Sequence, residues 1–492
     1  MEGDEPRART ERTPSVIDAV VPVVVLAVLI AGAIALFGLD ALDGPVQAAL
    51  VLCCMVAALI GMKNGHRWSA VQEAGQRSLA SISSAVFILL AVGALIATWS
   101  MAGTIPTLVS YGIQVLSPTW YYAATAIICG VVAMSIGSSW TTAGTIGVGL
   151  TGIAVVLGVS PAITAGAVIS GAYLGDKLSP LSETTVLSAQ LVKIDLYEHI
   201  KRQAWTSLPA FGIALAVFLV LGLVHVGDRS ATADADVDLR ALDQIFNIGP
   251  LTLLPLVLLV FLSVRRAPAS LSIAGSALFA GLLALVLQPD IVRDFAGDRG
   301  PVRTQVEAIW RAIATGFSID SGNADVDQLL SRGGMAGMLL TLWLIIGAVT
   351  FGTLLEELGL TAPLIDPLVR SARTTGRLFL AVFATAFGLN IVAGDQYLAL
   401  VLPGRVFRAE FARRGLAPSN LSRLVSDCGT VTSPLVPWNS CGAFMSAALG
   451  VSTLLYLPFC VFCIASPVLS LLYGFTGFKV ERVPAGQDEP VS

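Results

Sequence analysis

Three charged side chains stand almost alone in a long apolar part of this 492-residue chain. Between positions 79 and 190 the only charged residues are Asp176, Lys177 and Glu183. A charge inside a membrane costs several kcal/mol, so charged groups there are kept mainly where function requires them. Helix breakers and hydroxyl residues surround these charges in SGAYLGDKLSPLSETT, residues 170–185. We therefore predict an ion-binding site in this segment.

The predicted ligands in this half are all oxygen atoms. Gly175 and Pro180 are expected to interrupt a helix, which would free backbone carbonyls to coordinate a cation. Carboxylate, hydroxyl and carbonyl oxygens suit a hard cation such as Na+, and the segment has no His or Cys for a transition metal. The alternative is that Asp176 and Lys177 form a solvated pair at the membrane edge. The candidate ligands here are Asp176, Glu183, Ser179 and, in the hydroxyl-rich segment 136–145, Ser138 and Ser139.

The second half of the chain contains a comparable set. The segment GLNIVAGDQYL (388–398) carries polar groups around Gly394, which is expected to interrupt a helix. DCGTVTSPLVPWNS (427–440) carries a second group, with Gly429 and Pro434 as expected breakers. We predict Asp176 and Asp395 as the titrating pair. The alternative for Asp427 is an ion pair with Arg423 one helical turn away. The candidate ligands in this half are Asn390, Asp395, Asp427, Thr430, Ser433 and Asn439.

Composition indicates the class of protein that must position these groups. Apolar residues make up 55% of the chain and charged residues 13%, with a mean hydropathy of +0.80. A soluble protein has about 25% charged residues. The composition excludes a soluble enzyme and predicts an all-α polytopic protein of the cell membrane, in contact with lipid. The chain has no Lys/Arg run long enough to bind nucleic acid, and nothing in it indicates a cofactor.

Charged loops predict the orientation of the chain. Cationic residues cluster before the first apolar run, Ala19–Phe37, and again after the second. Because cytoplasmic loops are enriched in Lys and Arg, both termini are predicted to be cytoplasmic, as tails 1–15 and 479–492. The loop 227–247 and the connector 290–334 are then external.

The chain contains a long internal repeat. Gly175 and Gly429 lie 254 residues apart, as do Ser179 and Ser433, each of which begins a Ser-Pro-Leu sequence. At this offset, a charged loop in one half corresponds to an uncharged loop in the other. This pairing of a charged loop with an uncharged one is expected if the two halves have opposite topology, because corresponding loops then lie on opposite sides of the membrane. We predict two inverted repeats, 16–226 and 248–478, with interrupted or re-entrant hairpin helices in the motif regions 137–188 and 388–451.

Four segments give the chain a family resemblance. GSSWTTAGT, GAYLGDKLSPLSETT, AGDQYLALVLPGR and DCGTVTSPLVPWNSCGAFMSAALG resemble the signature segments of the NhaC-type Na+/H+ antiporter family. The resemblance implies an ion-transporter-superfamily fold, in which a transport domain lies beside a scaffold. It also implies Na+/H+ exchange, or in some relatives coupling of Na+ and H+ to malate and lactate. Relatives often carry Asp at the position of Glu183, which bears on ion selectivity.

The sequence therefore predicts a secondary transporter. Na+ and H+ would compete for intramembrane carboxylates, and alternating access would carry them across the membrane. The alternative within transport is a Na+/H+-coupled exchanger of a small carboxylate. An intramembrane aspartyl protease is disfavoured because Tyr173 and Val392 stand where that class has Gly, and a channel because no selectivity-filter repeat is present. The fold resemblance also suggests a homodimer.

Overall fold

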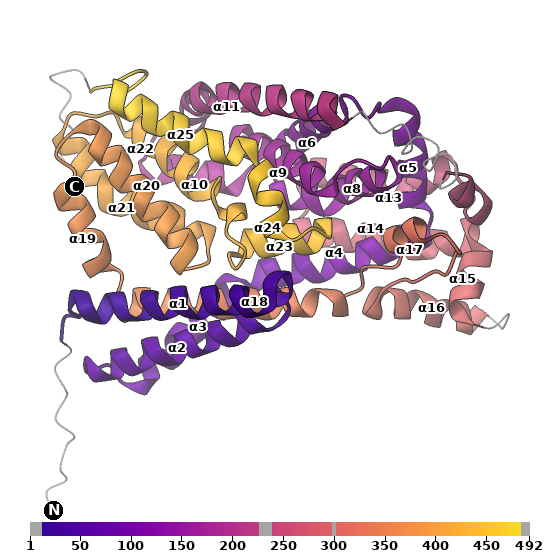
Figure 1. The fold of residues 1–492 in the computed structure, drawn as a ribbon, viewed down its shortest axis with the longest axis horizontal. Coiled ribbons are helices and arrows are strands. Elements are labelled where there is room, and N and C mark those ends of the chain that lie inside the picture. The colour runs from indigo at the N-terminus through magenta and orange to yellow at the C-terminus, as the bar shows by residue number, and fades with distance from the viewer. Residues whose placement is uncertain (1–11, 226–238, 298–301, 484–492) are drawn as a thin grey trace, which may run out of the picture.

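The chain folds as a bundle of helices in the computed structural model, which describes residues 12–225, 239–297 and 302–483 (Figure 1). Within these ranges, eight helices are long and apolar enough to cross a membrane, or ten if two sharply bent helix pairs each count as one span. The only strand-like pairing in the same ranges is an isolated bridge between Leu416 and Arg482. The prediction of an all-α polytopic membrane protein is confirmed.

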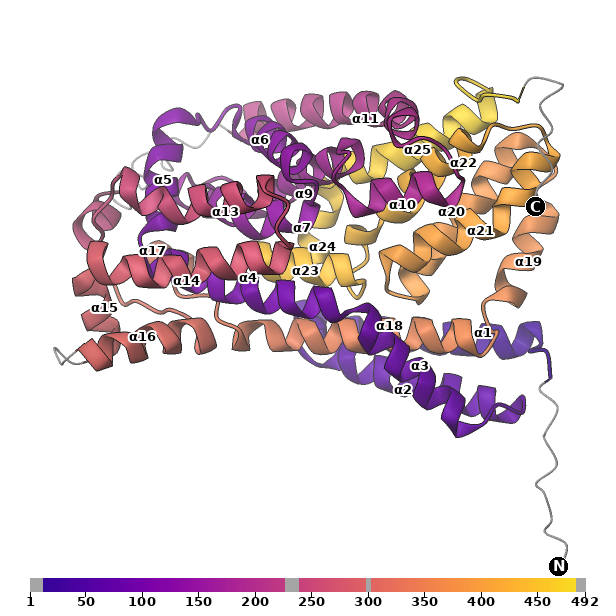
Figure 2. The same ribbon diagram turned by 180° about the vertical axis from the view of Figure 1, so that it is seen from behind.

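Four helices form a layer along one side of the molecule (Figures 1 and 2). They are α1 (Val16–Phe37), α2 (Pro45–Lys63), α3 (Trp68–Ser81) and α18 (Leu339–Glu357). Helix α1 begins at a capping box in which Ser15 and Asp18 satisfy each other's backbone N–H groups. In the 18-residue stretch that makes this segment a candidate span, only 22% is buried. Helix α1 therefore presents an apolar face of the kind that suits lipid.

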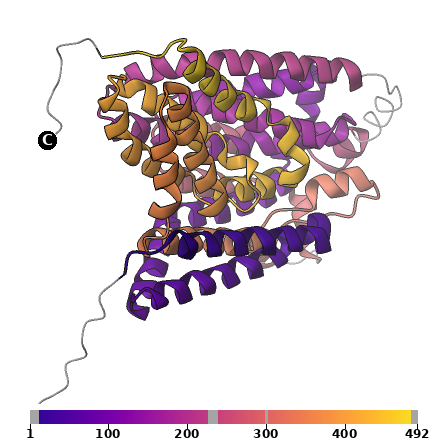
Figure 3. The ribbon, with the colours of Figure 1, turned by 60° about the vertical axis from the view of Figure 1, so that its left-hand side comes forward.

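The remaining helices form the larger part of the bundle. Seen after a 60° turn, α1 and α2 lie on one side and the orange and yellow C-terminal helices on the other (Figure 3). In the first half of the chain, the main helices of this larger part are α4 (Ser83–Met101), α5 (Thr104–Val115), α6 (Tyr121–Ile136), α8 (Val148–Val156), α9 (Pro161–Leu178), α10 (Glu183–Leu191) and α11 (Leu196–His225). Those in the second half are α13 (Leu254–Val264), α14 (Ala269–Leu287), α19 (Ala362–Ser371), α20 (Thr375–Val392), α21 (Gln396–Arg413), α22 (Pro418–Val425), α23 (Ser440–Leu449) and α25 (Val461–Thr476).

Several helices begin at corresponding positions in the two halves, separated by nearly the 254 residues that separate the repeated sequence motifs. Helix α6 begins at Tyr121 and α20 at Thr375, which lie 254 residues apart. The starts of α4 and α18, of α9 and α22, and of α10 and α23 are separated by 256 or 257 residues. The two halves thus contain corresponding helices in the same order.

Both Ser-Pro-Leu sequences lie where a helix is interrupted. Helix α9 ends at Leu178, and α10 begins at Glu183 after a break that contains Pro180. In the second half, α22 continues into a π-helical turn, η5 (Ser426–Thr430), and a short 3-10 turn that includes Pro434 precedes α23. Proline has no backbone N–H and so cannot continue the hydrogen-bond ladder.

Of the three glycines predicted to break helices, only Gly394 does so. It separates α20 from α21 with φ +62°, a left-handed conformation that favours glycine. Gly175 lies inside α9 and Gly429 inside the π-helical turn η5, so the prediction was wrong for these two. Both instead allow close packing, since a Cβ atom at Gly429 would lie 2.6 Å from the Ala399 carbonyl oxygen.

Replacing Gly175 with alanine is expected to destabilise the protein by roughly 1–3 kcal/mol, the usual cost of overpacking. An added Cβ would lie 2.4 Å from the Gly130 carbonyl oxygen on α6, and backbone cannot move aside cheaply. Thermal unfolding of the purified protein in detergent measures the loss. The matched control is Gly212→Ala on α11, where no atom lies within 4 Å of the added Cβ. Equal midpoints for the two variants would contradict this account.

The predicted loops and tails contain more structure than expected. The connector 290–334 includes most of α15 (Pro289–Ala296), together with α16 (Val302–Thr315) and α17 (Ala324–Leu330), which lie at the end of the molecule opposite the start of α1 (Figure 1). Within 227–247, residues Leu239–Ile245 are helical. The Ala417 N–H donates to the Glu481 carbonyl at 3.0 Å, so the start of the C-terminal tail contacts the α21–α22 loop. Residues 1–11, 227–238 and 484–492 of the predicted tails and loop lie outside the described residues.

Candidate functional site

Four helix N-termini converge on a cavity of about 940 Å³. They belong to the helix Ser139–Val156, which begins with α7 (Ser139–Thr142), and to α10, α21 and α23. The positive end of each helix dipole favours negative charge nearby. The four N-termini therefore favour anionic groups in this cavity. The residues of these first turns that line it include Ser138, Ser139, Ser182, Glu183, Asp395, Gln396 and Ser440.

Asp176 is one of the two aspartates that line this cavity. It lies in the last turn of α9 and is only 6% exposed. Its Oδ2 atom accepts a hydrogen bond from the Ser139 hydroxyl at 2.8 Å. A second bond spans the break between α9 and α10, because the Thr185 hydroxyl donates to the Asp176 backbone carbonyl oxygen at 3.0 Å. The Ser139 hydroxyl therefore holds the carboxylate, and the Thr185 hydroxyl holds the backbone of the same residue.

Asp395 is the other aspartate that lines the cavity, and it comes from the second half of the chain. It is the N-cap of α21, and its Oδ1 atom accepts the Leu398 N–H at 2.9 Å. Gly394 precedes it, and the Gly394 carbonyl accepts the Ser440 N–H of α23 at 2.8 Å. The capping bond uses only part of the carboxylate's capacity, which is about four lone-pair sites. Asp395 can thus cap α21 and still present oxygen to the cavity.

Glu183 also lines the cavity, and its carboxylate accepts a hydrogen bond from a tyrosine. The Tyr397 hydroxyl donates to Glu183 Oε2 at 2.8 Å. Glu183 is the first residue of α10 and Tyr397 lies in the first turn of α21, so this bond joins the two halves. Tyr397 lies in AGDQYLALVLPGR, one of the four segments that carry the family resemblance, but it was not among the predicted site residues.

Charged side chains line one part of the cavity wall. Arg77 forms an ion pair with Glu357, and both are partly exposed to solvent. The others in this group are Arg266, Glu356 and Arg405. Arg77 lies within α3, Arg405 lies within α21, and Arg266 follows α13. Cationic segments are expected on the cytoplasmic side.

Five predicted ligands are buried beside the breaks and do not line the cavity. The Asn390 amide donates to the Gly429 carbonyl at 2.6 Å, and the Asn439 amide donates to Asn390 Oδ1 at 3.0 Å. The Ser433 hydroxyl donates to the Thr430 carbonyl at 2.6 Å, and the Ser179 hydroxyl to the Met134 carbonyl at 2.8 Å. These groups hold the interrupted helices together. Ser179, Asn390, Thr430, Ser433 and Asn439 form this set.

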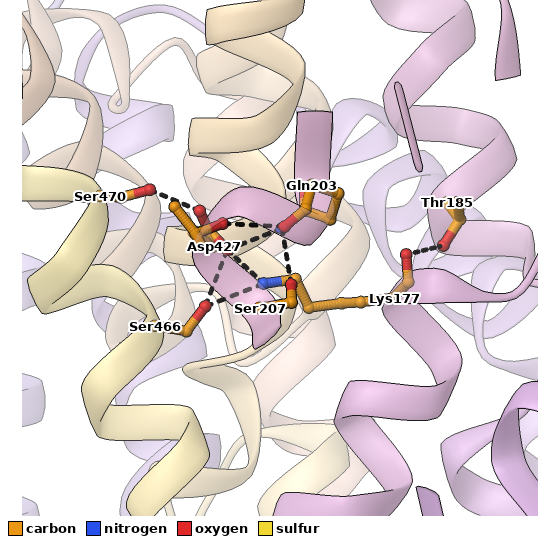
Figure 4. Close-up of polar contacts among 8 residues, drawn as sticks. Lys177, Thr185, Gln203, Ser207, Asp427, Ser466 and Ser470 are labelled. Carbon is orange, nitrogen blue, oxygen red and sulfur yellow. Dashed lines mark hydrogen bonds and ion pairs between the residues drawn. The ribbon is translucent and has the colours of Figure 1, made fainter. Parts of the chain in front are cut away.

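Asp427 is also separate from the cavity, in a buried polar cluster (Figure 4). Its carboxylate forms an ion pair with Lys177, and both side chains are 0% exposed. Gln203 donates to Asp427 Oδ1 at 2.7 Å, and the Ser466 hydroxyl does so at 2.8 Å. Ser470 donates to the other carboxylate oxygen.

This cluster replaces both pairings that the sequence suggested. Arg423 donates to the Lys479 carbonyl at 3.2 Å, and Lys177 is buried rather than solvated. The cluster joins α9 and α11 of the first half to η5 and α25 of the second. Gln203, Ser466 and Ser470 were missed, and Lys177 was noted as a lone charge but not as the partner of Asp427. The i,i+4 spacing of the two serines in an apolar helix is the one signal that could have indicated a polar face.

Interrupted helices around a carboxylate-lined cavity, in a polytopic helical protein, are typical of secondary transporters. The sequence profile of the Na+/H+ antiporter family matches residues 9–203 and 171–478. The chain belongs to this family, and it is a multi-pass membrane protein.

Relatives in this family include different antiporters. The chain is 38% identical to the Na+/H+ antiporter NhaC of Alkalihalophilus pseudofirmus, over 88% of this chain and 90% of that protein. It is 35% identical to the malate-2H+/Na+-lactate antiporter of Bacillus subtilis, over 89% and 90%. It is 34% identical to the arginine/ornithine antiporter ArcD of Halobacterium salinarum, over 96% and 94%. All three relatives are antiporters and none is an enzyme, but their substrates differ.

Proposed function

We propose that this protein exchanges Na+ for H+ across the cell membrane, with the two ions competing for one site between Asp176 and Asp395. The observation that carries the proposal is that these two aspartates, from different halves of the chain, line the same cavity. Membership of the Na+/H+ antiporter family supports the choice of ions.

The residues around Asp176 fit a Na+ site. Its carboxylate and the Ser138 and Ser139 hydroxyls are hard oxygen donors, and Asp395 supplies a second carboxylate to the same cavity. Two carboxylates that share a partly desolvated cavity repel each other when both are ionised. A bound Na+ or a bound proton relieves this repulsion, and the presence of one disfavours the other.

Alternating access would move the part containing the broken helices against the layer of α1, α2, α3 and α18. We propose that the halves are inverted repeats, which the recurring helix order and the opposite loop charges support. The cavity then opens to the cytoplasm, because Arg77, Arg266 and Arg405 line it. In this conformation the site would exchange ions with the cytoplasm.

A ΔpH assay in everted membrane vesicles tests the proposal. Dissipation of a preformed pH gradient by NaCl alone, compared with choline chloride, is the expected result. Vesicles from cells without the protein are the control. If NaCl has no effect but NaCl with malate or lactate does, the cation-only exchange is wrong.

The second candidate function is Na+/H+-coupled exchange of a small carboxylate. Arg266, Arg405 and four helix N-termini line the cavity, and all of them favour an anion. The B. subtilis relative named as a malate-2H+/Na+-lactate antiporter gives this candidate a specific precedent. A response that requires the organic acid would favour it, and the aspartates would then bind the coupling ions.

A further inference from the structure

Five carboxylates line the cavity, and one of them has no polar partner. Four accept a hydrogen bond or form an ion pair, namely Asp176, Glu183, Asp395 and Glu357. Within the part of the chain that the structure describes, the Glu356 carboxylate makes neither a hydrogen bond nor an ion pair. All of its acceptor capacity, about four lone-pair sites, is therefore available to a ligand in the cavity.

The position of Glu356 on its helix is unfavourable for a negative charge. It lies in the last turn of α18, where the negative end of the helix dipole repels a carboxylate, and Glu357 follows it directly. Val349 and Thr353, seven and three residues earlier, line the same cavity, so one face of α18 is turned toward it. A cation bound at Glu356 would relieve both repulsions.

The charged groups around Glu356 also favour a cation. Those close enough to act on it electrostatically are Glu357, Arg405, Asp395 and Arg77. Arg77 and Glu357 form an ion pair, which leaves Arg405 beside two carboxylates, Glu356 and Asp395. This part of the wall therefore carries an excess of negative charge, which raises the local concentration of cations.

We propose that Glu356 binds Na+ as it enters from the cytoplasm and passes it on to Asp395. This inference rests on the proposed Na+/H+ exchange by alternating access. Glu356 belongs to α18, in the layer against which the broken helices would move, whereas Asp176 and Asp395 lie at the breaks themselves. Glu356 can therefore accompany the two aspartates only while the site faces the cytoplasm. Removing its charge should weaken the capture of Na+ from that face alone.

The test compares Na+ titrations from the two faces of the membrane, in everted and in right-side-out vesicles with an acidified interior. Choline chloride keeps the ionic strength constant, so that screening is equal in all samples. In everted vesicles, Glu356→Gln is expected to raise the half-saturating Na+ concentration about fivefold, the effect of one unit charge at contact distance in water. In right-side-out vesicles its value should equal that of the unmodified protein. Half-saturation does not depend on the amount of protein in the membrane.

Two further variants serve as controls. Glu73→Gln removes one negative charge from α3, where the side chain is 61% exposed and does not line the cavity. It should leave half-saturation unchanged, and a shift as large as that of Glu356→Gln would contradict the proposal by reducing the effect to general surface charge. Glu356→Asp keeps the charge and should recover most of the affinity that Glu356→Gln loses.

The sidedness of the shift decides the proposal. A shift of equal size from both faces would mean that Glu356 acts in the shared site or through the packing of α18, and the proposal would be wrong. No shift from either face would also overturn it. If the unmodified protein does not respond to Na+ from either face, the proposed function is wrong, and this proposal with it.

Discussion

Asp176→Asn is expected to abolish Na+-driven dissipation of a pH gradient, with a fall in rate of about 100-fold or more. Asparagine can still accept the Ser139 hydroxyl bond seen at 2.8 Å, so the local packing is retained. It can neither carry a proton nor balance the charge of a cation. The initial rate of dissipation in everted vesicles, normalised to protein in the membrane, measures the effect.

The matched control for this variant is Asp290→Asn. The Asp290 side chain is 83% exposed, contacts Arg293 at 3.0 Å and does not line the cavity. Its rate is expected to equal that of the unmodified protein. If Asp176→Asn keeps more than about a tenth of the rate, Asp176 is not the shared binding group and Asp395 alone would have to serve.

Lys177→Met is expected to destabilise the folded protein by about 3–5 kcal/mol, the cost of leaving a buried charge without its partner. Asp427 would lose its ion pair while its side chain stays 0% exposed. Because Lys177 and Asp427 join the two halves, the loss should appear as a lower unfolding midpoint of the whole protein in detergent.

Two further variants separate this effect from loss of an ordinary ion pair. Adding Asp427→Asn to Lys177→Met removes the unpaired charge and keeps an acceptor for Ser466 and Ser470, so much of the lost stability should return. Arg303→Met breaks the exposed Arg303–Glu307 pair, whose side chains are 86% and 61% exposed, and should cost less than about 1 kcal/mol. A double variant no more stable than Lys177→Met would refute the charge argument.

The sequence predicts much of the fold because hydropathy is a local property. Spans such as α2, α14 and α18 are continuous apolar runs, and the structure has helices there. The glycine roles were harder to predict. Gly175 was expected to break a helix, yet it packs against α6, because its effect depends on a helix more than 40 residues earlier in the chain.

The candidate site was predictable where a residue's type was unusual for its surroundings. Asp176 and Asp395 stand out as carboxylates in apolar segments, and both line the cavity. Asp427 stands out equally but is paired with Lys177, 250 positions away in the sequence. No local pattern distinguishes an aspartate that faces a cavity from one neutralised by a lysine of the other half. Only the packing of α9 and α25 around η5 decides between them.

The most direct test of the account is whether Na+ binding expels a proton. The purified protein in detergent, in a weakly buffered solution, would receive NaCl or choline chloride while the pH is recorded. We expect NaCl to release protons from the unmodified protein and not from Asp176→Asn. Na+ binding without proton release, or equal release from the variant, would contradict a shared site between Asp176 and Asp395.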